Sequence, residues 1–228
     1  MCNQSGMQFI EKHLVPDEVM GKTVIEVGAL NVNGSPREKV ERLRPASYLG
    51  VDISMGPGVD QVCDVKDLVS RFGRDRFDVV ISTELMEHVQ DWRTAISNLK
   101  NMVAPGGTIL VTTRSRSFPY HGYPYDFWRF ELDDMRRIFS DFSIQALEAD
   151  TSSPGVFFKA RKPASFSENN LESIELYSIV TGRVCKTIRP TDLLLLKAMI
   201  GLRRLLAKGV PESVKERLKR ALFRKDML

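Results

Sequence analysis

A run of twelve residues near the N-terminus, TVIEVGALNVNG (residues 23–34), restricts the fold more than any other part of the chain. Its first half is β-branched and apolar apart from Glu26, which indicates a strand buried on both faces. Gly28 follows directly, and a helix-like stretch begins at Pro36. A buried strand that ends on a glycine and leads into a helix is typical of open α/β sheets, which bind ligands at the carboxyl ends of their strands. We therefore expect a ligand crevice beside Gly28.

The same alternation of strand and helix continues along the chain. Strand-like stretches rich in β-branched residues alternate with segments of helical periodicity, as in a parallel sheet with crossover helices. A turn at residues 151–155 indicates a hairpin between the last two strands and one antiparallel strand. The expected fold class is α/β, a doubly wound, mostly parallel, seven-stranded Rossmann-like sheet with helices on both faces. The strands are expected at residues 24–27, 47–53, 61–65, 77–83, 108–113, 142–149 and 155–161, and helices at 9–19, 36–43, 66–72, 91–102 and 132–139.

Charge divides the chain near residue 163. Residues 1–163 contain 20 Lys+Arg and 22 Asp+Glu, whereas residues 164–228 contain 13 and 7, so the basic balance belongs to the C-terminal part. We expect two units, a main domain at 1–163 and a basic helical C-terminal extension at 164–228. The extension is expected to be weakly helical at 171–180, with stronger helices from Pro190 and Pro211. Such helices can pack on their own protein, form a homodimer seam or contact an anionic membrane peripherally, and the first is the commonest.

Other sequence features exclude several classes of protein. The N-terminus has no basic region followed by an apolar run, so no secretory signal is predicted. Charges interrupt the most apolar stretch, residues 193–206, and no transmembrane segment is expected. The three cysteines, Cys2, Cys63 and Cys185, show no metal-ligand spacing and are interpreted as free thiols. These features predict a cytoplasmic protein without a metal site.

Two carboxylates after Gly28 suggest which ligand the crevice binds. The loop lacks the further glycines of a dinucleotide fingerprint, so it is not suited to a pyrophosphate. Asp52 ends the second strand, 24 residues after Gly28, where a carboxylate can accept hydrogen bonds from both hydroxyls of a ribose. Asp64 ends the third strand and could meet an adenine amine, with Ile53 and Val65 as apolar walls for the base. The pattern favours adenosine held by its ribose and base.

Several motifs, in order and with family spacing, resemble one known family. They are VIEVGALNVNGS, YLGVDISMGPGVD, CDVKDL, FDVVISTELMEHVQDWRTAISNLKNMVAPGGTILVTT and HGYPYDFWRF, within residues 7–162. The chain resembles class I S-adenosylmethionine-dependent methyltransferases of the type-11-like small-molecule group. The resemblance implies S-adenosylmethionine as cofactor, and Leu30 and Val32 stand where the commonest first motif has glycine. It implies that Glu26 and Gly28 line the methionine end, Asp52 holds the ribose, Asp64 and Val65 border the adenine, and Thr83 and Glu84 lie beside the sulfonium.

Acceptor residues are expected after the fourth and fifth strands. His88 follows the fourth strand and is the first candidate for a catalytic base, because imidazole titrates near neutral pH; local packing is an equally good interpretation. His121 is the second candidate. It lies in an aromatic segment, PYHGYPYDFWRF, where the family commonly places its acceptor-binding loop. The residues of this segment expected to contact the acceptor are Tyr123, Tyr125, Asp126, Trp128 and Arg129.

Three functions remain open from the sequence. The first is methyl transfer to a small-molecule or saccharide acceptor, at oxygen, by in-line displacement. The second is nucleic-acid methylation, which the basic C-terminal part suggests. Residues 82–85 lack the signature of amino-methylating enzymes, and Cys63 does not follow a proline, so the Pro-Cys nucleophile of carbon methylation is missing too. A nucleic-acid partner is therefore not favoured. The third is a non-catalytic cofactor-binding or scaffold protein of the same fold.

Overall fold

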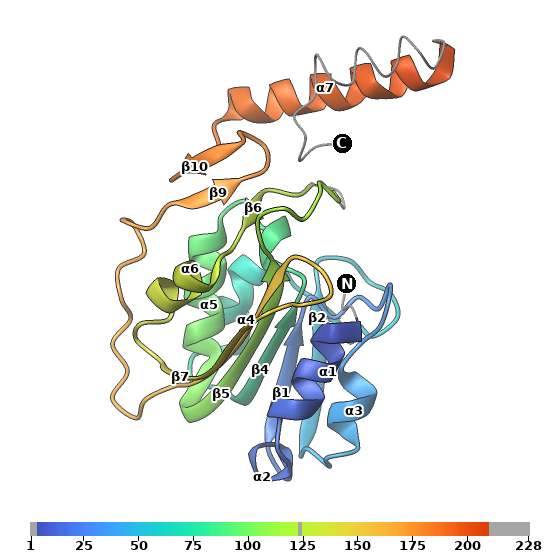
Figure 1. Ribbon diagram of the computed structural model, residues 1–228. Helices are drawn as coiled ribbons and strands as arrows, with labels where there is room; N and C mark the ends of the chain where they lie inside the picture. The colour runs from blue at the N-terminus through green and yellow to red at the C-terminus, as the bar shows by residue number, and fades with distance from the viewer. Residues whose placement is uncertain (1–3, 123–124, 210–228) are drawn as a thin grey trace.

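The computed structural model describes residues 4–122 and 125–209 and shows a seven-stranded sheet between two layers of helices (Figure 1). The strand order is β3-β2-β1-β4-β5-β8-β7, and β8 pairs antiparallel with both of its neighbours. The order reverses at β1, so β1 and β4 lie side by side at the topological switch point, where α/β folds bind ligands. The strands are β1 Thr23–Val27, β2 Ser47–Asp52, β3 Gln61–Val62, β4 Phe77–Thr83, β5 Val103–Arg114, β7 Ser143–Ala149 and β8 Gly155–Arg161.

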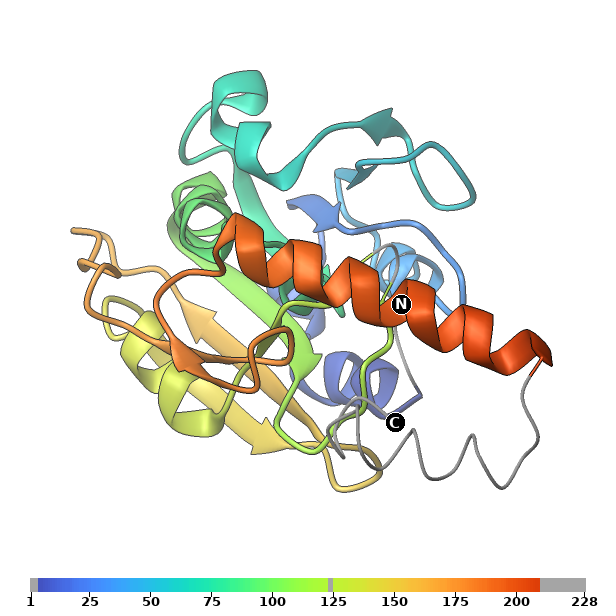
Figure 2. The ribbon, with the colours of Figure 1, turned by 90° about the horizontal axis from the view of Figure 1, so that it is seen from above.

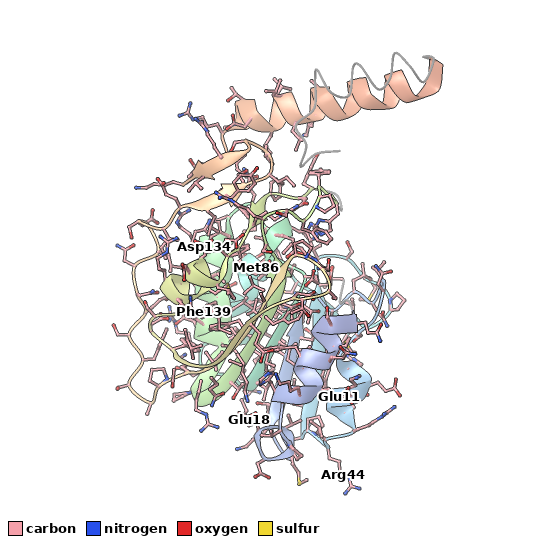
Figure 3. The ribbon with its side chains drawn as sticks, viewed as in Figure 1. Glu11, Glu18, Arg44, Met86, Asp134 and Phe139 are labelled. Atoms are coloured by element: carbon pink, nitrogen blue, oxygen red, sulfur yellow. The ribbon has the colours of Figure 1, made fainter. Side chains whose placement is uncertain are left out.

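Alternation along the central strands divides their side chains between two hydrophobic cores. In β1, Val24 belongs to one core and Ile25 to the other, because successive side chains of a strand point to opposite faces. The smaller core lies under α1 (Gln4–His13), α2 (Pro16–Val19) and α3 (Arg37–Glu41). The larger core lies under α5 and α6, where Met86 and Phe139 point inward, whereas Glu11 and Arg44 lie at the surface (Figure 3). The helical elements of this layer are η1 Val65–Asp67, α4 Leu68–Phe72, η2 Met86–His88, α5 Trp92–Met102 and α6 Leu132–Ile138.

The expected fold class is confirmed, with three local differences. The leading helix is interrupted before Pro16, because proline lacks an amide hydrogen and disfavours helical backbone in the residue before it. β3 is only two residues long, and the Asp64 side chain accepts a hydrogen bond from the backbone N–H of Lys66 at the start of η1. β5 begins directly after α5 and includes Pro105 to Gly107. Asp91 caps α5, accepting a hydrogen bond from the backbone N–H of Thr94.

The segment after residue 163 differs most from the sequence prediction. The expected weak helix at 171–180 is wrong, because Leu176–Ser178 forms strand β9. β9 pairs with β6 (Trp128–Arg129) and β10 (Arg183–Cys185) in a second, three-stranded sheet. The apolar residues of this segment that belong to the larger core are Leu171, Ile174, Leu176 and Ile188. Residues 164–188 are therefore packed on the body that contains the seven-stranded sheet rather than set apart from it.

Helix α7 (Pro190–Gly209) confirms the first of the two stronger C-terminal helices, and the helix expected from Pro211 lies outside the described residues. Viewed from above, α7 crosses over the carboxyl-end side of the large sheet (Figure 2). Near its start Leu196 is buried, whereas Leu194 and Leu195 are exposed. None of the described helices combines the length and the apolar character needed to cross a membrane.

Candidate active site

A cavity of about 310 Å³ opens at the carboxyl ends of the first four strands. Its walls come from the segments that follow β1, β2, β3 and β4, and one residue comes from the aromatic segment after β5. Most of the lining is apolar, and its acidic side chains are Asp52, Asp64 and Glu84. The lining residues are Val27, Gly28, Leu30, Val32, Asp52, Ile53, Ser54, Cys63, Asp64, Val65, Lys66, Glu84, Leu85, His88, Val89, Gln90 and Tyr125.

Gly28 allows β1 to turn sharply at the cavity wall. Its φ angle is +85°, in the region that L-residues with a Cβ rarely adopt. A Cβ at this position would lie 3.1 Å from Cβ of Leu85, so the loops after β1 and β4 approach each other closely here. Glycine is therefore required both by the backbone angle and by the neighbouring wall.

The two carboxylates predicted for the adenosine part line the cavity. The Asp52 carboxylate is oriented by two backbone N–H donors, Leu30 at 3.2 Å and Ser54 at 3.0 Å. The Asp64 carboxylate accepts from the Lys66 backbone N–H at 2.9 Å. Both acids are thereby fixed at the cavity wall, and each retains acceptor capacity for a ligand hydroxyl or amine.

Glu26 and Thr83 are not among the lining residues, although both belong to strands that end at the cavity. The Glu26 carboxylate is buried and accepts hydrogen bonds from the hydroxyl groups of Tyr48 at 2.6 Å and Ser35 at 3.3 Å. Burial raises the pKa of Glu26 to about 7, although these hydrogen bonds oppose the shift. These hydrogen bonds connect β1 to β2 through Tyr48 and to the loop that follows β1 through Ser35.

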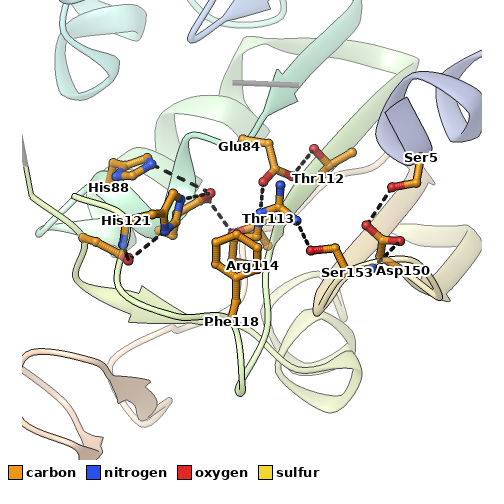
Figure 4. A network of polar contacts seen from close by, with 12 residues as sticks. Ser5, Glu84, His88, Thr112, Thr113, Arg114, Phe118, His121, Asp150 and Ser153 are labelled. Atoms are coloured by element: carbon orange, nitrogen blue, oxygen red, sulfur yellow. Dashed lines mark hydrogen bonds and ion pairs between the residues drawn. The ribbon is translucent and has the colours of Figure 1, made fainter. Parts of the chain in front are cut away.

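Glu84 reaches the cavity from a left-handed backbone position directly after β4, with a φ angle of 51°. Its carboxylate forms an ion pair with Arg114 and accepts a hydrogen bond from the Thr112 hydroxyl at 2.9 Å (Figure 4). Burial and the nearby charge of Glu87 raise the pKa of Glu84. A non-glycine residue in this conformation is a local strain of the kind that gathers at functional sites.

Directly beside Glu84 lies a cluster that the sequence did not predict, formed by Glu87, His88 and His121. Nε2 of His88 lies 3.9 Å and Nε2 of His121 lies 3.7 Å from Oε1 of Glu87 (Figure 4). The three side chains together have the composition of a metal-ligand group, with ligand atoms within 4.8 Å of one another. His88 lines the cavity itself, whereas Glu87 and His121 lie behind it. The expectation that no metal-ligand group exists is therefore not supported by the tertiary structure.

The aromatic segment after β5 is divided between the cavity and the protein interior. Tyr125 lines the cavity, and its carbonyl oxygen accepts from Nδ1 of His88 at 2.7 Å. Trp128 and Arg129 do not line it, because both side chains are 1% exposed and held inside. Trp128 donates its indole N–H to the carbonyl of Gln90 at 3.0 Å. Tyr123 lies outside the described residues.

Asp126 is also absent from the lining and lies at the centre of a buried charge network. Its two oxygens accept from Nη1 of Arg129 at 2.5 Å and Nη2 of Arg129 at 2.7 Å, and one of them also contacts Nδ1 of His121 at 2.9 Å. Burial alone would raise the pKa of Asp126, but Arg129 and His121 lower it to about 2. Arg129 also donates to the carbonyls of Phe118 and Pro119. These contacts give Asp126 and Arg129 a role in holding the segment that carries His121 and Tyr125.

A family model described as a methyltransferase domain matches residues 14–151, more than half of the chain. The chain belongs to this methyltransferase family. The fold, with its seven-stranded sheet, is that of class I S-adenosylmethionine-dependent enzymes, as the sequence resemblance implied. S-adenosylmethionine is the cofactor of these enzymes.

Two sets of known proteins are similar to this methyltransferase-family chain. The ubiquinone biosynthesis O-methyltransferase of Chromobacterium violaceum is 27% identical over 129 residues, which are 50% of this chain and 53% of that protein. The protein of the same name from Parvibaculum lavamentivorans is 25% identical over 105 residues, 46% of this chain and 40% of that protein. The chain thus spans about half the length of the curated relatives it matches.

Solved structures share the fold at low identity. An S-adenosylmethionine-dependent methyltransferase from Mesorhizobium loti has a TM-score of 0.53 and 17% identity, covering 69% of this chain and 98% of that one. The 1,6-didemethyltoxoflavin-N1-methyltransferase of Burkholderia thailandensis, solved with its substrate and S-adenosylhomocysteine, has a TM-score of 0.54 and 15% identity, covering 70% of this chain and 77% of that one. At these identities the likeness concerns the fold.

The cavity residues fit the chemistry of S-adenosylmethionine. Asp52 offers an oriented carboxylate for ribose hydroxyls, and Val65 and Cys63 offer buried apolar surface next to Asp64 for a base. Leu30 and Val32, which replace glycines of the commonest motif, line the cavity instead of blocking it. Sequence reasoning missed several apolar lining residues, because a leucine or valine after a strand carries no chemical signal that distinguishes a cavity wall from a core position. These are Leu30, Val32, Leu85 and Val89.

Proposed function

We propose that this protein transfers the methyl group of S-adenosylmethionine to an oxygen of a small, largely apolar acceptor. The observation that carries the proposal is the continuity of one cavity. Asp52 and Asp64 at one part of its wall suit the adenosine of the cofactor, and His88 and Tyr125 line the same cavity. Donor and acceptor can therefore occupy adjoining parts of a single site, as direct transfer requires.

The acceptor class follows from the lining near His88. Leu85, Val89 and Tyr125 provide apolar and aromatic surface, and His88 is the imidazole among the described lining residues. Such a surface favours a flat or apolar molecule over an extended polyanion. The similarity to proteins named O-methyltransferases supports oxygen as the acceptor atom, and a hydroxyl acceptor needs a group that helps to remove its proton.

Each polar residue of the cavity has a distinct part in this proposal. When bound, S-adenosylmethionine supplies a cationic sulfur and an electrophilic methyl group. Asp52 orients the cofactor, and Glu84, which is paired with Arg114, places carboxylate oxygens at the cavity wall, where oxygen atoms favour a cationic sulfur. His88 activates the acceptor hydroxyl, and the carbonyl of Tyr125 orients its imidazole ring.

The first test is calorimetry with S-adenosylhomocysteine on the wild-type protein and on Asp52→Ala. Hydrogen bonds to a charged group contribute about 1.5–3 kcal/mol, so we expect Asp52→Ala to weaken binding by about 10–100-fold. Methyl transfer from isotope-labelled S-adenosylmethionine is then measured on a panel of phenols, catechols, saccharides and aromatic amines. Absence of S-adenosylhomocysteine binding by the wild-type protein would refute the proposal, and methylation of nitrogen alone would refute the choice of oxygen.

A further inference from the structure

We infer that Glu87, His88 and His121 form a binding site for a divalent transition-metal ion, with Zn²⁺ as the best match. The ligand atoms are Oε1 of Glu87 and Nε2 of both histidines. Two imidazoles and one carboxylate make up a common three-ligand set of catalytic zinc sites, in which further positions are open to water or substrate. The site adjoins the cavity because His88 also lines it.

The free oxygen of Glu87 is the first argument for a bound ion. The Glu87 side chain is fully buried, and its Oε2 accepts from the Thr113 hydroxyl at 2.9 Å. Its Oε1 is buried without a hydrogen-bond partner among the described residues. A buried oxygen without a partner costs free energy unless some group satisfies it. Both histidines direct a ring nitrogen toward this atom.

The charge balance around Glu87 is the second argument. The other two buried acids of the region have arginine partners, Arg114 for Glu84 and Arg129 for Asp126. In the described part of the chain, the ion pairs of Glu87 are only those with His88 and His121. Buried carboxylates require a compensating positive charge. A protonated His121 supplies it without an ion, and a divalent ion between the two imidazoles would supply it in place of that proton.

The surroundings of the two histidines are the third argument. Nδ1 of His88 donates to the carbonyl of Tyr125, and Nδ1 of His121 contacts the carboxylate of Asp126. Each contact occupies the far nitrogen of its ring, so that Nε2 of both rings faces Glu87. Burial alone would lower the pKa of His121, but its contacts with Asp126 and Glu87 raise it to about 9, so an ion at its Nε2 would displace a proton. Metal-binding histidines in proteins are oriented in this way, with the second nitrogen donating to a carbonyl or carboxylate.

The distances require a small closure of the site. Ligand atoms about 2.1 Å from a tetrahedral zinc ion lie about 3.4 Å apart, whereas the two nitrogens lie 3.7 and 3.9 Å from Oε1 of Glu87. His121 is the more exposed partner, with 22% of its side chain accessible against none of Glu87, so the closure would fall on its ring. The role of the ion in catalysis rests on the proposed function. An acceptor hydroxyl bound at an open coordination position of the ion would lose its proton more readily. His88 would then act as a metal ligand instead of a base.

The test uses full-length protein without a histidine tag. Protein stripped with a chelator is dialysed against Zn²⁺ and its metal content is measured, and Co²⁺ is added separately to record its ligand-field absorption spectrum. The variants are Glu87→Gln, which preserves side-chain shape, and His121→Gln. The matched control is His13→Gln, because His13 is the third histidine of the chain and contacts Glu148 instead.

We expect one ion per chain in the wild-type protein and in His13→Gln, and loss of the ion in both site variants at a Zn²⁺ concentration that saturates the wild type. Calorimetry with S-adenosylhomocysteine should give similar affinities for all four proteins, which shows that the variants are folded. Equal metal content in the wild type and both site variants would overturn the inference, as would loss of the ion in His13→Gln. A wild-type protein that binds the ion but not S-adenosylhomocysteine would refute the proposed function alone.

Discussion

Replacing Gly28 by alanine tests whether the backbone turn after β1 builds the cofactor cavity. The φ angle of Gly28 is +85°, and placing an L-residue in a left-handed conformation costs about 1–2 kcal/mol. The added Cβ would also lie 3.1 Å from Cβ of Leu85, so one wall must move by a few tenths of an ångström. Because a loss of 1 kcal/mol lowers the Tm of a chain of this size by roughly 2–4 °C, the backbone penalty alone predicts a decrease of about 2–8 °C.

Gly73 provides the matched control. Its φ angle is +88°, and a Cβ there would meet no atom within 4 Å. Gly73→Ala should therefore lower the Tm by about the same backbone penalty without altering the cavity. Gly28→Ala should lower the Tm at least as much and also weaken S-adenosylhomocysteine binding at least ~10-fold, or about 1.4 kcal/mol.

Thermal unfolding and calorimetry on the two variants provide the measurements. The difference between the variants isolates the effect of the cavity wall from that of the backbone angle. If both variants bind S-adenosylhomocysteine as tightly as the wild type, Gly28 does not line the cofactor site and the reasoning from the cavity is wrong.

Two further predictions concern stability. Burial raises the pKa of Glu26 to about 7, so the stability associated with its protonated form is present below its ordinary pKa near 4.5 and is lost as the pH rises through about 7. The Tm of the wild type relative to Glu26→Gln should thus fall between pH 5 and pH 8, and a constant difference across that range would contradict the assignment. A chain ending at Lys162 should be severely destabilised, because it lacks four buried apolar side chains of the larger core, each worth about 1.5–3 kcal/mol, against a typical total stability of 5–15 kcal/mol. A chain ending at Arg189 keeps them and should unfold cooperatively near the full-length Tm; similar melting of both truncated chains would show that residues 164–188 do not stabilise the body.

For residues 164–188, the local sequence pattern was not enough to predict the structure. The change to polar composition near residue 163 suggested a boundary, and residues 171–180 had enough helical periodicity to suggest a weak helix. In the structure, Arg93 of α5 donates to the carbonyls of Leu171, Ile174 and Lys186. Long-range contacts of this kind hold the segment in extended form, and they override a weak local propensity.

The sequence by itself determined the seven strands of the large sheet and the cavity wall at Gly28, Asp52 and Asp64. These features are local, since they depend on β-branched runs, on a glycine after a strand and on acids at strand ends, and parallel strands bring such ends to one edge. It also indicated that His88 and Tyr125 would lie near this edge.

Only the tertiary structure decided how the polar residues of the aromatic segment are used. Trp128 and Arg129 carry the same chemical groups whether they line a site or lie inside the protein, and their burial depends on β9, which is distant in sequence. The approach of His121 to Glu87 and His88 likewise depends on the buried pair of Asp126 and Arg129, which holds the loop. Spacing along the chain does not encode this cluster, because His121 lies 33 residues after His88 and meets the adjacent Glu87 and His88 only through packing.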